Sequence, residues 1–308
     1  MATLIQKYLF DDESFYAANF SDGQKVSFFR TLPYEETVNN KEYVEILDYE
    51  KATSGVKESN KFAIGLCSCR HEKLHIGEKK CNVPLETCSS FRGGADYSIR
   101  YGFAKEVSKS KMLENIARSK ELGLVINVDN AQRNISFMCH CCKCCCNMLL
   151  GITKHGYPNT IVSSTYIAEV DESKCKSYDR CYEVCPIDCI ERVPVENPTS
   201  KKETKPKIDE SRCIGCGICA VKCPAGAIKM VKRKQRVIHP ATIYERLMLQ
   251  CLERGTLQYQ LFDNPESITQ KAMRALVGGF LRLPPVKKAL MSDMLRSSFF
   301  RSLMRFKI

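Results

Sequence analysis

The sequence predicts an α+β protein in which a cysteine module of repeated spacing lies between an N-terminal cysteine-rich α+β domain and a C-terminal helical segment. The 308 residues include 19 cysteines, of which none precedes Cys67 and only Cys251 follows Cys223. Two cysteine groups share one spacing, whereas apolar residues after position 240 recur at helical intervals. We therefore expect a cysteine-free region at 1–60, a cysteine-rich domain at 61–165, the repeated module at 166–236 and a helical region at 237–308.

Composition and charge indicate a globular protein that binds metal. Hydrophobic residues make up 44% and charged residues 27%, which excludes a wholly disordered or collagen-like chain. The N-terminal residues 1–7 are followed by Asp11, Asp12 and Glu13 instead of an apolar signal core, and no run approaches ~18 apolar residues. We expect a cytoplasmic protein in a reducing compartment, where cysteines bind metal more often than they form disulfides.

Ten cysteines form the first two groups. The first group has the spacing C-x-C-x11-C-x6-C, and its four soft ligands suit a four-iron cluster or zinc. The second places six thiols within eight residues, which fits neither helical nor strand periodicity and predicts a coiled loop. Ten thiols suffice for two four-thiolate clusters with two left over, and spacing does not determine which thiols pair. The candidate ligands are Cys67, Cys69, Cys81, Cys88, Cys139, Cys141, Cys142, Cys144, Cys145 and Cys146.

Basic residues and histidines lie among these thiols. Arg70 and Lys143 are expected to offset the negative charge of a thiolate-bound cluster. We expect His71, His75 and His140 to be neighbours of the ligands or exposed residues rather than ligands.

A helix and a strand are predicted between the two groups. Residues 110–122 place Met112, Ile116 and Leu122 near one helical face, and Gly123 can end the helix. Residues 124–128 are apolar enough for a strand. Helix followed by strand is also the outline of a winged helix, but the basic residues of this helix are balanced by acidic ones, so nucleic-acid binding is not expected.

The fourth group contains the spacing C-x2-C-x2-C-x3-C-P, from Cys213 to Pro224. Three thiolates in one tight loop suit a single cubane cluster, whereas structural zinc sites usually take two separated C-x2-C pairs. Gly215 and Gly217 let the backbone approach such a cluster closely. The third group is an imperfect copy, in which Cys175 and Cys181 keep the spacing before Cys185-Pro186 and Tyr178 stands at the second-ligand position.

These two runs resemble the two-cluster ferredoxins, in which the fourth cysteine of each run ligates the other cluster. The resemblance implies a 4Fe-4S cluster held by Cys213, Cys216, Cys219 and Cys185, and a partner cluster with only Cys175, Cys181 and Cys223. The segment from Cys185 to Cys189 resembles seven-iron ferredoxins, which implies a 3Fe-4S cluster at the partner site, with Cys189 nearby. The alternative is a 4Fe-4S cluster that recruits Cys189 or Asp179. The longer insert at 191–212 is expected to be a solvated loop.

The residues after 240 predict helices. Thr242 and Glu245 form a capping box before a helix that ends at Gly255, with Cys251 on its apolar stripe. A second helix follows Pro265, with Ile268, Ala272, Ala275 and Leu276 inward, until Pro284-Pro285. From 286 to 308 the pattern is a basic amphipathic helix, suited to packing on the core or a partner, or to contact with a membrane surface.

The whole pattern, with a C-x-C-R-H segment and a CC-x-CCC segment before two ferredoxin runs, resembles long ferredoxin-domain proteins of anaerobic bacteria. That resemblance implies electron transfer, and we expect four clusters in a relay subunit of a larger anaerobic oxidoreductase. The net charge of +12 suits acidic redox partners. The sequence contains neither a G-x-G-x-x-G motif after a predicted strand nor a Walker loop. It therefore gives no nucleotide-binding signal that would indicate an independent enzyme. Two alternatives are a reductase with substrate chemistry at an N-terminal cluster and a zinc-binding nucleic-acid or scaffold protein.

Overall fold

The computed structural model describes residues 1–20, 26–38, 48–194, 204–234, 237, 239–292 and 299. The chain divides into two compact units, Met1–His239 and Pro240–Ile308. All cysteines except Cys251 belong to the first unit. The four-part division expected from the sequence stays a proposal, because the structure separates the chain only after His239.

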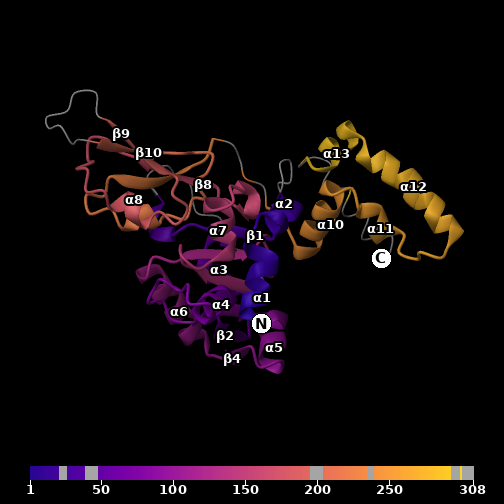
Figure 1. Ribbon diagram of the computed structural model, residues 1–308, viewed down its shortest axis with the longest axis horizontal. Helices are drawn as coiled ribbons and strands as arrows, with labels where there is room; N and C mark the ends of the chain where they lie inside the picture. The colour runs from indigo at the N-terminus through magenta and orange to yellow at the C-terminus, as the bar shows by residue number, and fades with distance from the viewer. Residues whose placement is uncertain are drawn as a thin grey trace. The chain divides into compact units, whose positions relative to one another are not determined.

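A seven-stranded sheet organises the N-terminal part of the first unit (Figure 1). Its order is β4-β2-β3-β6-β5-β1-β7, and all neighbours are antiparallel except β1 and β7. The strands are β1 (Phe29–Leu32), β2 (Phe62–Leu66), β3 (Glu86–Phe91), β4 (Ala104–Glu106), β5 (Val125–Asp129), β6 (Phe137–Cys141) and β7 (Ile161–Val162). The predicted apolar strand is therefore β5, which is buried along its whole length between β6 and β1.

Helices surround this sheet. They are α1 (Ala2–Ile5), the π-helical turn Gln6–Phe10, α2 (Ser14–Phe20), α3 (Ala52–Lys57), α4 (Ser68–His75), α5 (Arg92–Arg100), α6 (Lys109–Glu121) and α7 (Asn147–Thr153), with short 3₁₀ turns at Glu35–Thr37, Asp48–Glu50 and Pro158–Thr160. The predicted helix is α6, capped by Ser108, whose hydroxyl accepts from Lys111 N at 3.2 Å. Met112 and Ile116 are buried as expected, but Leu122 is exposed, because the helix ends one residue before it.

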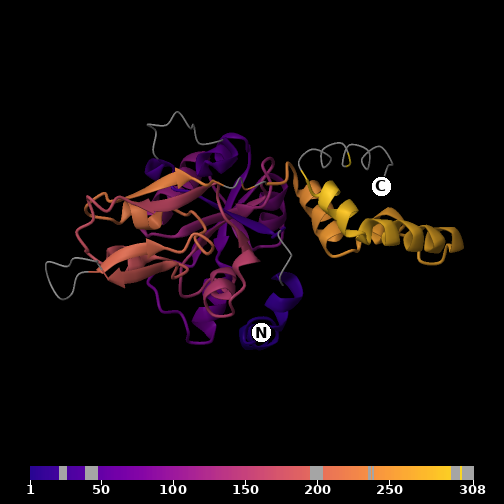
Figure 2. The same ribbon diagram turned by 90° about the horizontal axis from the view of Figure 1, so that it is seen from above.

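The cysteine module consists of two interleaved halves. Its elements are β8 (Tyr166–Val170), α8 (Arg180–Val184), β9 (Ile190–Pro194), β10 (Thr204–Ile208), α9 (Ile218–Val221) and β11 (Ile228–Lys232). β8 pairs with β11 and β9 pairs with β10, both antiparallel, so each sheet takes one strand from each half. Figure 2 shows the two strand pairs side by side. The insert at 191–212 is thus not a solvated loop throughout, because its ends pair as β9 and β10; residues 195–203 lie outside the described part.

The sheet and the module share one hydrophobic core. Leu32, Tyr34 and Ile126 belong to the same set of packed buried residues as Ile218 and Met230. Tyr34 N donates to the Cys216 carbonyl at 3.1 Å, and Val38 forms an isolated parallel bridge with Met230. Residues before position 60 therefore contribute both a sheet strand and a support for the module.

The second unit is helical, with α10 (Ile243–Glu253), α11 (Leu257–Leu261), α12 (Ile268–Arg282) and α13 (Pro284–Leu290). Thr242 caps α10 by accepting from Glu245 N at 3.2 Å, which confirms the predicted start. The predicted inward face of α12 is wrong: Ile268 and Leu276 are 83% and 72% exposed, and Leu281 is buried instead. Beyond α13, the predicted amphipathic tail lies largely outside the described residues. Among the helices that the structure describes, none is long and apolar enough to cross a bilayer.

Candidate metal centres

Four cysteines surround one cavity in the second half of the module. Three come from the loop and helix after β10, and the fourth is the residue that follows α8. All are buried and line the same cavity: Cys185, Cys213, Cys216 and Cys219. Gly215 and Gly217, both with positive φ, turn the loop so that its thiols point to one side. The structure thus brings together the four residues of the predicted complete site.

These thiols fit an iron–sulfur cluster. Burial raises the pKa of Cys216 and Cys219, so neither would ionise alone at neutral pH. None of the 19 cysteines, all of which lie in the described part of the chain, forms a disulfide. Buried thiols that face a common cavity without bonding to each other are suited to iron ions, whose positive charge lets them bind as thiolates.

We call the site of Cys213, Cys216, Cys219 and Cys185 the second site, and the site of Cys175, Cys181 and Cys223 the first site. Cys189 lies at the second site, whereas the sequence analysis placed it near the first. Its Sγ is 3.6 Å from Cys185 Sγ, it hydrogen-bonds with Cys213, and it lines the same cavity. The reason is local: the short turn after Pro186 folds the chain back, so that Cys189 N donates to Cys185 Sγ at 3.4 Å. Recruitment of Cys189 to the first site is therefore not supported.

The first site has three cysteines and a tyrosine. Cys175, Cys181 and Cys223 line one cavity together with Tyr178 and Asp179. Tyr178, which the spacing assigns to the second-ligand position, is 58% exposed. Asp179 takes a left-handed conformation and pairs with Arg192 at 3.4 Å. Three thiolates with an exposed phenol leave one corner of a cubane without a cysteine ligand.

The ten N-terminal cysteines divide into a group of six and a group of four, which spacing alone could not show. In the first, each thiol interacts with two others, and these interactions close into a ring. Around it the order is Cys67, Cys69, Cys146, Cys141, Cys139 and Cys88. We call these residues the six-thiol ring. Cys67 directly precedes α4, Cys69 lies in its first turn, Cys88 lies in β3, Cys139 and Cys141 lie in β6, and Cys146 directly precedes α7.

The other four thiols form a compact group, which we call the tetrad: Cys81, Cys142, Cys144 and Cys145. Their Sγ atoms all lie within 4.8 Å of one another. The predicted coiled loop supplies three of them, because Cys145 N and Cys146 N both donate to the Cys142 carbonyl and turn the chain back. Val83 and Leu124 pack against the tetrad in a small separate core.

Arg70 lies between the two groups and is fully buried. Its guanidinium hydrogen-bonds with Cys142 of the tetrad, and the charges of Cys67 and Cys88 in the ring act on it. It also donates to the His140 carbonyl at 2.8 Å and to Thr87. Burial lowers the pKa of Arg70, but the thiolates outweigh this effect and raise it above its ordinary value. Arg70 thus offsets thiolate charge, as the sequence predicted for this cation.

The histidines have other partners. His140 is buried with its Nε2 3.0 Å from Ser89 Oγ, and burial followed by the Arg70 charge lowers its pKa to about 3. His71 and His75 lie one turn apart on α4, with their Nε2 atoms 3.0 Å apart. The side-chain hydrogen bonds that the structure gives these three histidines join them to each other or to Ser89, not to a thiol.

A short turn that the sequence analysis missed begins each of the two cysteine loops of the module. The Asp171 carboxylate accepts from Ser173 N at 3.2 Å, and Asp209 accepts from Ser211 N at 3.0 Å. The carbonyls of the two aspartates accept from the amides of Cys175 and Cys213, respectively. The signal was present, because D-E-S-[KR]-C occurs at 171–175 and again at 209–213.

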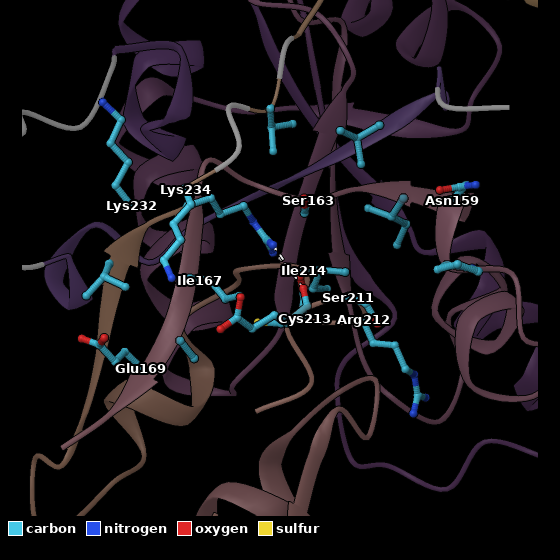
Figure 3. A pocket seen from close by; sticks show the side chains of 18 residues that line it. Asn159, Ser163, Ile167, Glu169, Ser211, Arg212, Cys213, Ile214, Lys232 and Lys234 are labelled. Atoms are coloured by element: carbon cyan, nitrogen blue, oxygen red, sulfur yellow. Dashed lines mark hydrogen bonds between the residues drawn. The ribbon is translucent and has the colours of Figure 1, made fainter. Parts of the chain in front are cut away.

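A basic cavity of about 700 Å³ opens beside Cys213. Arg233 lines it and donates to the carbonyls of Ser164, Glu210 and Cys213, which fixes the start of the cysteine loop. In Figure 3, Lys232 and Lys234 lie on one side of Cys213 and Arg212 lies on the other.

Comparisons with known proteins agree with this geometry. The 4Fe-4S binding domain family matches residues 206–229, which include the Cys213 loop. An uncharacterized ferredoxin of Methanocaldococcus jannaschii is 38% identical over 76 residues, covering 24% of this chain and 42% of its own. The pyruvate synthase subunit PorD of Methanothermobacter marburgensis is 37% identical over 70 residues, covering 23% of this chain and 72% of that subunit. Hydrogenase-4 component A of Escherichia coli is 32% identical over 93 residues, covering 29% and 40%.

The fold and the cysteine sites of the module define an iron–sulfur protein. The chain belongs to the 4Fe-4S ferredoxin-type proteins, on the evidence of this module. It spans less than half the length of the M. jannaschii ferredoxin. No solved structure matches the chain.

Proposed function

We propose that this protein is a one-electron relay subunit of a larger oxidoreductase of anaerobic metabolism. The main support for this proposal is that one compact unit contains both cysteine-lined cavities of the ferredoxin module and ten further thiols in two groups. Two relatives are named as parts of redox enzymes, a pyruvate synthase subunit and a hydrogenase component. The N-terminal C-x-C-R-H and CC-x-CCC segments support the resemblance to long ferredoxin-domain proteins.

Each site has its own cluster in this proposal. Cys185, Cys213, Cys216 and Cys219 hold a 4Fe-4S cluster, and Cys175, Cys181 and Cys223 hold a 3Fe-4S cluster, because Tyr178 replaces the fourth thiol. The six-thiol ring holds a further iron–sulfur cluster. When bound, such clusters take up and release single electrons. The chain's own contribution is to bury the thiols and to place Arg70 where it offsets their charge, which raises a cluster's potential.

The basic cavity beside Cys213 is the proposed docking site for an acidic redox partner. Arg212, Lys232 and Lys234 line it, and Cys213 is a ligand of the proposed 4Fe-4S cluster. A carboxylate-rich partner would be attracted to these cations and would reach the protein close to that cluster. Replacing Lys232 and Lys234 by glutamate should slow electron transfer to an acidic ferredoxin and weaken its dependence on salt. Replacing Lys109 and Lys111 on the exposed face of α6 is the matched control.

The test of the function is anaerobic purification followed by iron and sulfide analysis, EPR, and electron transfer between artificial donors and ferredoxins. Iron–sulfur EPR signals that appear and disappear with one-electron reductants are expected. A chain that binds iron and sulfide but exchanges no electrons on the timescale of enzyme turnover would contradict the proposal.

A reductase is the second candidate, because the six-thiol ring has two more thiols than a cubane uses. Spare thiols beside a cluster could take part in substrate reduction. Turnover of a substrate by the isolated chain with an artificial electron donor would favour this candidate, and its loss in Cys88→Ser and Cys139→Ser, with cluster content retained, would place the reaction at the ring.

A further inference from the structure

We propose that the tetrad of Cys81, Cys142, Cys144 and Cys145 holds a single Zn²⁺ ion in tetrahedral coordination, not a second N-terminal cubane. The site is structural and is independent of the electron-transfer function. It fixes the loop after α4 to the loop before α7.

The spacing of the four sulfur atoms carries this proposal. Cys81 Sγ is 3.7 Å from Cys142 Sγ and 3.9 Å from Cys145 Sγ, and Cys144 Sγ is 3.9 Å and 3.2 Å from those two atoms. Four thiolates at a Zn–S distance of about 2.3 Å form a tetrahedron whose edges are about 3.8 Å. The separations of 3.7, 3.9 and 3.9 Å are close to this edge, the Cys144–Cys145 separation of 3.2 Å is shorter, and all pairs lie within 4.8 Å, so the four sulfur atoms are near enough to bind one metal ion.

A four-iron core requires a wider arrangement. Each of its thiolates binds a different iron, so the sulfur atoms stand roughly 6 Å apart around the core. Among the described residues, only the tetrad has three or more such ligand atoms all within 4.8 Å of one another, so the four proposed cluster ligands of the ferredoxin module are not gathered as closely. The thiols of Cys213, Cys216 and Cys219 instead line a cavity. The tetrad has all four of its sulfur atoms within 4.8 Å of one another.

The chemistry of the site favours zinc among thiophilic divalent ions. Zn²⁺ binds a given site more tightly than Fe²⁺, and four thiolates without an open position are typical of structural zinc. Arg70 hydrogen-bonds with Cys142, and the Val83 amide hydrogen-bonds with Cys81, so the excess negative charge of the four thiolates is partly offset.

The surroundings give the site a structural purpose. Leu124 packs against Cys142 and Cys145, and its carbonyl accepts from Tyr34 Oη at 2.7 Å. Tyr34 N in turn binds the Cys216 carbonyl, and Lys143 of the tetrad loop pairs with Asp188 of the ferredoxin module. A metal ion in the tetrad therefore braces the contact between the N-terminal sheet and the ferredoxin module.

Metal and sulfide analysis of the full chain tests the proposal. The chain is produced with both iron and zinc in the medium and purified anaerobically. We expect about one zinc per chain, and zinc X-ray absorption should show four sulfur neighbours at about 2.3 Å. Cys144→Ser should lose zinc and keep its iron and sulfide, whereas Cys251→Ser, in the other unit, should keep all three.

The opposite results are equally clear. If Cys144→Ser loses iron, with or without sulfide, or the unaltered chain contains no zinc with four sulfur neighbours, the assignment is overturned. The absorption measurement uses the unaltered chain, so a folding failure of the variant does not affect it. Loss of the ferredoxin EPR signals without loss of this zinc signature would count against the electron-transfer proposal alone.

Discussion

Replacing Gly215 by alanine should destabilise the loop that carries Cys213, Cys216 and Cys219. Gly215 has φ +71°, in the left-handed region that L residues avoid. An added Cβ would also lie far inside van der Waals contact with Ser164 Oγ and the Tyr166 carbonyl oxygen. The carbonyl belongs to the first residue of β8, so the clash cannot be relieved by a side-chain rotation.

The size of the effect follows from two contributions. The left-handed conformation costs an alanine about 1–2 kcal/mol. Overpacking against neighbours that cannot move costs typically ~1–3 kcal/mol more. Gly226 offers a matched control, because its φ is +59° but an added Cβ would meet nothing within 4 Å. Gly226→Ala should therefore show the first cost without the second.

The assay is anaerobic thermal unfolding together with iron and sulfide content. In a unit of this size, ~1 kcal/mol shifts Tm by about 2–4 °C, so Gly215→Ala should melt roughly 2–12 °C below Gly226→Ala. It should also lose cluster from the second ferredoxin site on purification. If the two variants have the same Tm and the same iron content, the close approach of this loop to β8 is not a constraint and the reasoning fails.

Three further predictions concern single residues. Cys216→Ala should lose about four irons with their sulfide, together with the reduced-state EPR signal, because a cubane needs four thiolates. The control Cys251→Ser should keep the iron, the sulfide and the signal. Unchanged iron in Cys216→Ala would contradict the proposed ligand set. Tyr178→Cys should gain one iron per chain and lose the 3Fe-type EPR signal of the oxidised protein. Tyr178→Phe should change neither the iron content nor the signal. If the cysteine variant gains no iron, Tyr178 does not stand at the second-ligand position between Cys175 and Cys181. Arg70→Met should lower the potential of the six-thiol cluster in an EPR-monitored titration, because the charge of Arg70 acts on Cys67 and Cys88 of the ring, and Arg70→Lys should restore part of it. An unchanged potential in the methionine variant would show that this cation does not act on the ring.

Local signals predicted much of the fold and of the ferredoxin sites. The C-x2-C-x2-C-x3-C-P spacing sets a loop whose thiols must face one side, so the cavity at Cys213, Cys216 and Cys219 follows from the sequence. The start of α10 at Thr242 and the buried face of α6 at Met112 were predictable because capping and helical periodicity act within a few residues.

The features that could not be predicted depend on contacts between distant segments. Cys81 joins Cys142 across about sixty residues, and Cys88 meets Cys139 because β3 and β6 pair in the sheet. Spacing within one loop contains no information on such pairing. The exposed face of α12 has the same origin: the periodicity of Ile268 and Leu276 marks an apolar stripe but does not say what covers it.

The second ferredoxin site is built by two parts of the chain, which has a consequence for its stability. An added Cβ at Gly217 would lie 2.6 Å from Thr37 Oγ1, and Tyr34 N binds the Cys216 carbonyl, so a segment far outside the module closes this loop. The relatives match the chain over about a quarter of its length, in a module whose own strands are only five residues long. Because a domain of that size buries little apolar surface, its loops in isolation depend on their clusters for stability. In this chain the contacts of Tyr34 and Thr37 add a restraint that does not require a cluster. The second site should therefore keep its loop conformation after cluster loss to a greater extent than the first site, where Tyr178 is exposed.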